Sequence, residues 1–138
     1  MRHRISTLIL CCSFALVSAA GAVPSGFDLR GTDPLKLLEI LKRDVGFDSV
    51  LSIGEPVENW VREKDLPQLI FLLDSPELCA PVANIRSSFI PDRSTVGEQA
   101  AFLIQGFRAG IYPPDLHSGR MAPGVKDEIR AWWAARKR

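Results

Sequence analysis

The sequence predicts an all-α fold, a small single-domain helical bundle of about five helices. Three observations predict it. Helix-start signals, in which an acidic or hydroxyl residue precedes a proline or opens a capping box, recur along the chain. After each signal, apolar residues recur every three or four positions, which places them on one face of a helix. Glycine or proline then closes the segment, because both residues interrupt helices.

Three of the predicted helices follow one another in residues 65–110. The first begins at an acidic cap with a proline in its first turn, and the second begins at Ser75, which also precedes a proline. Pro81 is expected to end or kink the first turn of the second helix. The third begins at the capping box TVGE, residues 95–98. The apolar positions are Leu66, Leu69, Ile70 and Leu73 in the first helix, Leu78, Val82, Ile85 and Phe89 in the second, and Val96, Ala100, Leu103 and Phe107 in the third.

The segment from Asp65 to Phe89, which contains LPQLIFLLDSPELCAPVANI, resembles a HEAT-type helical pair. Two predicted helices are joined there by Asp-Ser-Pro, with apolar stripes that face each other. The resemblance covers about one repeat. It implies an antiparallel packing of the two helices and a protein that has protein partners. An ordinary helical bundle is the alternative, because no second copy is visible at a spacing of about 40 residues.

The remaining predicted elements lie on either side of this stretch. Residues 33–46 begin at an Asp-Pro pair, carry a leucine stripe and end at a glycine, so they predict a helix. Residues 55–63 predict a short helix, and residues 126–136 predict the last one. Residues 47–54 fit a short strand or a buried loop. Residues 111–123 are rich in proline and glycine and predict a surface loop.

The amino-terminal segment has the pattern of a secretory signal peptide. Basic residues come first, an apolar run follows over residues 5–17, and Ala20-Gly21-Ala22 provides small residues at a cleavage site. Residues 1–22 are therefore expected to be removed, which leaves residues 23–138 as a single periplasmic or secreted domain. An uncleaved membrane anchor is the alternative, although the apolar run is shorter than the ~20 residues that span a bilayer.

Charge and cysteine content narrow the classes of partner. Loss of Arg2 and Arg4 with the signal peptide leaves 15 basic and 16 acidic residues, a net charge of −1. No overall basic character therefore points to nucleic acid. Cys11 and Cys12 also leave with the signal peptide, so the mature chain has one cysteine and no internal disulfide. That residue, Cys79, is expected to be a buried, small apolar side chain.

The chain lacks the recognisable motifs of several enzyme classes. His117 is the one histidine after residue 22, which excludes HExxH and multi-histidine zinc sites, and no GxSxG motif or phosphate-binding loop is present. We therefore predict no metal site and no cofactor. Acidic pairs such as Asp74 with Glu77, or Asp92 with Glu98, have the residue types of glycosidase chemistry. Their positions at predicted helix starts are better explained by capping and by the helix dipole.

Three short stretches hold candidate contact residues. Residues 85–94 form a polar loop with two arginines, and residues 108–117 carry an arginine and a tyrosine, which are favoured interface anchors. The last helix combines adjacent tryptophans with basic residues, which suits a protein partner or an anionic membrane surface. A C-terminal helix docked on the core is the alternative. The predicted partner-binding residues are Arg86, Ser88, Asp92, Arg93, Arg108, Tyr112 and Trp133.

These observations predict an exported protein-binding protein. In a bacterium it would serve as a periplasmic inhibitor or an immunity-type protein that blocks a toxic enzyme. Two alternatives stay open: a small cell-envelope hydrolase that uses paired carboxylates, and a structural envelope component. A polar pocket with two convergent acids would favour the hydrolase. An exposed apolar face would favour the binding protein. A membrane-bound C-terminal helix would favour the structural component.

Overall fold

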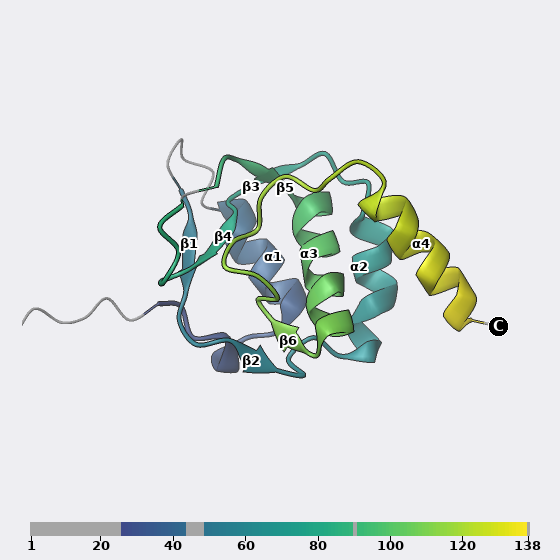
Figure 1. Ribbon diagram of the computed structural model, residues 1–138, viewed down its shortest axis with the longest axis horizontal. Coiled ribbons are helices and arrows are strands. Elements are labelled where there is room, and N and C mark those ends of the chain that lie inside the picture. The colour runs from purple at the N-terminus through teal and green to yellow at the C-terminus, as the bar shows by residue number, and fades with distance from the viewer. Residues whose placement is uncertain (1–25, 44–48, 90, 138) are drawn as a thin grey trace, which may run out of the picture.

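Helices and strands alternate along the chain in the computed structural model, which describes residues 26–43, 49–89 and 91–137. The fold is mixed α/β, so the prediction of an all-α bundle of about five helices was wrong. In Figure 1 the helices lie side by side in the order α1, α3, α2 and α4, with β1 and β4 at the end of the molecule opposite α4. The helices are α1 (Pro34–Arg43), α2 (Leu66–Leu72), α3 (Val96–Ala109) and α4 (Val125–Arg136), with short 3-10 helices η1 (Leu29–Gly31) and η2 (Glu63–Asp65).

The strands pair across long stretches of sequence. Three two-stranded sheets occur in the described residues: β1 (Leu51–Ile53) runs parallel to β4 (Val82–Asn84), β2 (Val57–Glu58) pairs antiparallel with β6 (Ile111–Tyr112), and β3 (Leu78–Cys79) pairs antiparallel with β5 (Ser94–Thr95). Single bridges extend the first sheet on both sides. Phe27 pairs with Ile53, and His117 pairs with Ala83.

The predicted helix over residues 75–89 does not form, so the helical pair expected from the HEAT resemblance is absent there. This segment instead contains β3 and β4. Pro76 and Pro81 lie five residues apart, and each lacks the N–H that a continuous helix needs. Every residue of β4 is buried, as in a strand covered on both faces. Residues 55–63, also predicted as a helix, contain β2 and the start of η2.

The predicted helix starts near Asp33, Asp65 and Thr95 are confirmed, whereas the cap-and-proline signals at Ser75 and Glu55 are not followed by a helix. The Asp33 side chain accepts a hydrogen bond from the Lys36 N–H at 2.9 Å, and α1 begins between them. Thr95 and Glu98 form the predicted capping box of α3, with the Glu98 N–H donating to Thr95 Oγ1 at 3.2 Å. Gly110 ends α3 in the left-handed conformation at φ 74°. The predicted last helix is also present, as α4.

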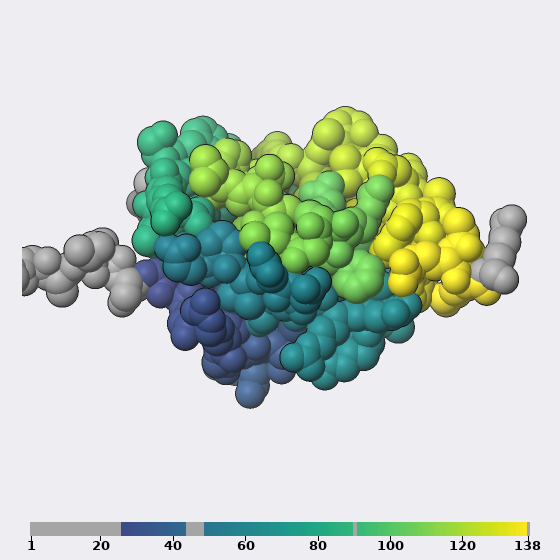
Figure 2. Space-filling view, turned by 60° about the horizontal axis from the view of Figure 1, so that its bottom comes forward, coloured from purple at the N-terminus to yellow at the C-terminus, as the bar shows by residue number. Residues whose placement is uncertain are grey.

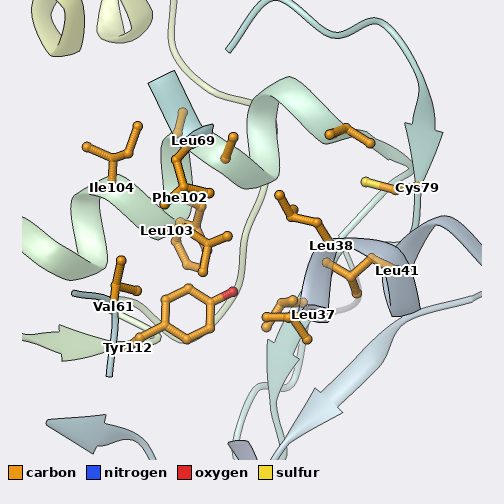
Figure 3. Close-up of a cluster of buried hydrophobic side chains, with 14 of the residues drawn as sticks. Leu37, Leu38, Leu41, Val61, Leu69, Cys79, Phe102, Leu103, Ile104 and Tyr112 are labelled. Atoms are coloured by element: carbon orange, nitrogen blue, oxygen red, sulfur yellow. The ribbon is translucent and has the colours of Figure 1, made fainter. Parts of the chain in front are cut away.

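The core is centred on α3, which packs between α1 and α2 (Figure 1). Gly97 allows α3 to lie very close to the turn that follows α2. A Cβ atom at this position would lie 2.3 Å from the Leu73 carbonyl oxygen in that turn. Figure 3 shows side chains from α1, α2, α3 and β6 meeting in one cluster. Its fully buried members include Leu37, Leu41, Leu66, Leu69, Leu73, Leu103, Ile104, Tyr112 and Ile129.

The amino-terminal predictions lie outside the described residues. Residues 1–22 and the expected end of the first helix at Gly46 fall in this category, so the signal peptide and its cleavage remain predictions. Among the helices that the structure does describe, none has the length and apolar character needed to cross a membrane.

Candidate interaction surface

The loop that follows β4 is held in one conformation by its own side chains. Asn84 accepts hydrogen bonds from the Arg86 N–H through Oδ1 (2.9 Å) and from the Ser87 N–H through its carbonyl oxygen (2.8 Å). The Ser87 hydroxyl then donates to the Phe89 carbonyl at 2.9 Å and accepts from the Phe89 N–H at 3.2 Å. These local turns satisfy the backbone without regular structure, so they fix where residues 85–89 point.

Three large apolar side chains are exposed where this loop meets the segment that carries His117. Ile85 is 43% exposed, Phe89 57% and Leu116 56%. The Asn84 N–H donates to the Leu116 carbonyl at 2.7 Å, and the Phe89 ring lies 4.9 Å from the His117 ring between centroids. The three exposed side chains therefore lie on two neighbouring segments, and we call them together the Phe89 patch (Ile85, Phe89 and Leu116).

Charged and polar residues border the Phe89 patch. Arg86 forms an exposed ion pair with Glu55 at 3.1 Å, and Ser88, Asp92 and Arg93 are exposed on the same loop. Apolar patches with polar rims are typical of protein interaction sites. The predicted contact residues Arg86, Ser88, Asp92 and Arg93 are thus exposed and within four residues of Phe89 in the sequence.

A buried polar network attaches the second segment of the patch to the core. The Gln99 amide nitrogen donates to the hydroxyls of Ser94 and Ser118, each at 2.8 Å. The Ser118 hydroxyl also accepts from the Val82 N–H at 2.7 Å and donates to the Val82 carbonyl at 3.2 Å. Because Ser118 is two residues from Leu116, this network fixes the position of the segment that carries Leu116 relative to β4.

Tyr112 is not on the surface, which corrects its prediction as an interface anchor. Its side chain is completely buried in the core (Figure 3), stacked at 5.2 Å on Trp60 and edge-on to Phe102 at 5.7 Å. Burial is the main cause that raises the pKa of its hydroxyl above the usual value of 10.0. The Tyr-Pro-Pro sequence lies beside this packed ring and does not present it to a partner.

Arg108 and Trp133 belong to a different surface, at the end of the molecule with α4. The Arg108 guanidinium lies 5.5 Å from the Trp132 ring centroid, and Trp132 lies 6.3 Å from Trp133. Arg108 also forms an ion pair with Glu128 at 2.9 Å. In Figure 1, α4 and the loop after β4 are at opposite ends, so the predicted residues form two groups and not one site.

The acidic residues proposed for hydrolase chemistry are engaged in structural contacts. Glu98 accepts hydrogen bonds from the Thr95 N–H at 2.9 Å and the Ser94 hydroxyl at 3.2 Å, as its capping role requires. Asp74 forms an ion pair with Arg130. Both acids line a cavity of about 310 Å³ beside the start of α4. In the part of the chain that the structure describes, no group of three metal-ligating side chains comes together.

Cys79 is expected to resist thiol reagents in the folded protein. It is buried in β3, and burial, followed by the charge of Glu98, raises its pKa from 9.0 to about 12. The thiolate required for reaction is therefore scarce at pH 8. Reaction of the mature chain with a chromogenic disulfide at pH 8 should proceed only as fast as unfolding. Complete labelling within the mixing time, with circular dichroism unchanged, would contradict this expectation.

The same shift gives a pH dependence of stability. Because the folded pKa of Cys79 lies above its unfolded value, its contribution is fully present below pH 9.0 and is lost as pH rises towards 12. The loss is about 1.4 kcal/mol per pH unit in that window. Cys79→Ala should therefore flatten the decline of unfolding free energy between these pH values. An identical pH profile for the variant would contradict the assignment to this thiol.

Comparison with known proteins identified no relative. No protein-family model matches the sequence, and no curated protein and no solved structure gives a significant match.

Proposed function

We propose that this chain is an exported protein-binding protein and that the Phe89 patch is its contact surface. One observation carries the proposal: among the residues that the structure describes, three of the five exposed large apolar side chains lie on two segments joined by a backbone hydrogen bond. Exposure of these apolar side chains to water is unfavourable in free energy, and such exposure is typical of a surface that a partner covers.

The geometry suits tight binding because the patch is already ordered. The turns at Asn84 and Ser87 hold Phe89 outward, so little conformational entropy is lost when a partner binds. Burial of each large apolar side chain contributes about 1.5–3 kcal/mol. The rim ion pair between Arg86 and Glu55 would influence orientation more than affinity, because both side chains are exposed.

Within this class, the role that we propose is inhibition of another protein in the cell envelope, as immunity-type proteins do for a toxic enzyme. The predicted signal peptide and the small size of the mature chain support this proposal. The contact with the inhibited enzyme would be made by the Phe89 patch.

A matched set of variants tests the contact surface. The mature chain, residues 23–138, is immobilised and exposed to an envelope extract from the source organism, and bound proteins are identified by mass spectrometry. The test variant is Phe89→Ser with Leu116→Ser. The control is Phe71→Ser, which removes a more exposed phenylalanine, 79% accessible, from α2.

We expect one stoichiometric partner that binds the wild type and the Phe71→Ser control equally. Its affinity for the double variant should be at least about 100-fold weaker, because two buried side chains are lost from the contact. Isothermal titration with the purified partner measures this difference. Equal binding by the double variant would contradict the assignment of the patch. The absence of any saturable partner would contradict the proposed function.

A further inference from the structure

The last helix, α4, contacts the rest of the protein mostly through side chains that are not fully buried. Of its twelve residues, Ile129 alone is buried, whereas α3 buries nine of fourteen. Figures 1 and 2 show α4 at one end of the molecule, beside α2 and α3 and away from the strands β1 and β4. The other apolar residues of α4, Val125, Trp132 and Trp133, pack against the core but stay partly exposed. Fewer fully buried side chains therefore hold α4 in place than hold α3.

Ion pairs connect α4 to the body at three points along its length. Arg130 forms an ion pair with Asp74, which follows α2 in the chain. Arg136 forms an ion pair at 2.8 Å with Glu63, which precedes α2. Glu128 pairs with Arg108 of α3 at 2.9 Å. The acidic partner is well exposed in every pair, so dissolved salt can screen these attractions.

Aromatic rings and cations complete the contact. The Trp132 ring lies 6.1 Å from Phe107 of α3, and the guanidinium groups of Arg108 and Arg136 lie 5.5 and 5.2 Å from the Trp132 centroid. The same two arginines thus serve both the ion pairs and the ring contacts. Loss of the charge pairs would also loosen the cover that Trp132 places over Phe107.

The connection before α4 permits movement. Gly124 adopts a left-handed conformation at φ 90°, a Cβ at this position would meet no atom within 4 Å, and no side chain caps the start of the helix. Residues 122–124 are exposed. These features place few restraints on the angle at which α4 leaves the body.

We infer that α4 is a movable helix that covers Phe107 and is held in place by ion pairs that dissolved salt can screen. It separates from Phe107 while the rest of the protein stays folded. Opening presents Trp132 and exposes the adjacent face of α3, an apolar surface distinct from the Phe89 patch. The inference does not depend on the proposed function, because it rests on the contacts of α4 alone.

Hydrogen exchange measured by mass spectrometry on the mature chain tests the inference. Peptides from α4 should exchange at least about tenfold faster than those from α3 at 0.05 M NaCl. Raising NaCl to 1 M, where screening acts within about 3 Å, should increase exchange in α4 by about a further tenfold. Exchange in α3, corrected for intrinsic rates, should stay unchanged. Equal protection of the two helices, or an equal effect of salt on both, would overturn the inference.

A charge swap separates the ion pairs from general effects of charge. Glu63→Arg places like charges together and should accelerate exchange in α4, whereas Glu63→Arg combined with Arg136→Glu should slow it again. The double swap should stop short of the wild-type rate, because Arg136 also lies over the Trp132 ring. Glu58→Arg is the control, since it makes the same charge change at a residue for which no ion pair is seen within the described residues. Failure of the double swap to slow exchange again, or an equal effect of the control, would overturn the inference.

Discussion

Replacement of Tyr112 by alanine is expected to destabilise the protein by about 3–5 kcal/mol, the range for loss of a large aromatic side chain from a core. Tyr112 is completely buried between Trp60 and Phe102, and its ring lies against Gly106, so the cavity has several walls that cannot collapse together. Urea denaturation followed by circular dichroism measures the change in unfolding free energy.

Tyr112→Phe is the matched control, because it keeps the ring and removes only the hydroxyl. That hydroxyl is buried and has no hydrogen-bond partner among the residues described, so its removal should be neutral or should stabilise the protein by about 1 kcal/mol. A stable Tyr112→Ala variant that loses only partner binding would instead restore the prediction of an interface anchor.

Replacement of Gly97 by alanine is expected to cost about 3 kcal/mol, at the upper end of the usual range for overpacking. The added Cβ would lie 2.3 Å from the Leu73 carbonyl oxygen and 3.0 Å from that of Ser75. Both obstacles are backbone atoms of the turn that follows α2, so this turn and the start of α3 must move apart. Thermal and urea unfolding of the variant provide the measurement.

Gly31→Ala is the control for this substitution. A Cβ at Gly31 meets no atom within 4 Å, so the change should lie within about 0.5 kcal/mol of zero. Similar stability of the two variants would show that the close approach at Gly97 is not required by the packing of α2 against α3.

The helices could be predicted where the signal was local. Asp33 and the Thr95–Glu98 capping box act within a single turn and identified α1 and α3. The helix α2 was predicted from its acidic and proline start, and α4 was predicted from the spacing of its apolar residues. A short strand was one of two interpretations of residues 47–54, and β1 lies there. The other strands were not predicted, because each spans two or three residues and depends on a partner elsewhere in the chain. Residues 78–89 have helical apolar spacing, but the distant hydrogen bonds of β4 and the two prolines override it.

The candidate site was predicted only in part. The polar residues of the loop after β4 identified residues 85–94 as a possible contact. Ile85 and Phe89 were assigned to a helix stripe and hence to the core, so their exposure was missed. Leu116 lies in the candidate stretch 108–117 but was not singled out, because its position beside β4 depends on the pairing of the next residue, His117, with Ala83.

The pairing of β1 with β4 and of Ala83 with His117 also bears on how the protein folds. Each contact joins residues about 30 positions apart, so loop-closure entropy is lost before the contact stabilises the chain. Contacts of this separation predict slower folding than in a helical bundle of this size, whose contacts are local. The Phe89 patch draws on two segments that meet only through these distant contacts, so a chain that has not yet formed them lacks the binding surface.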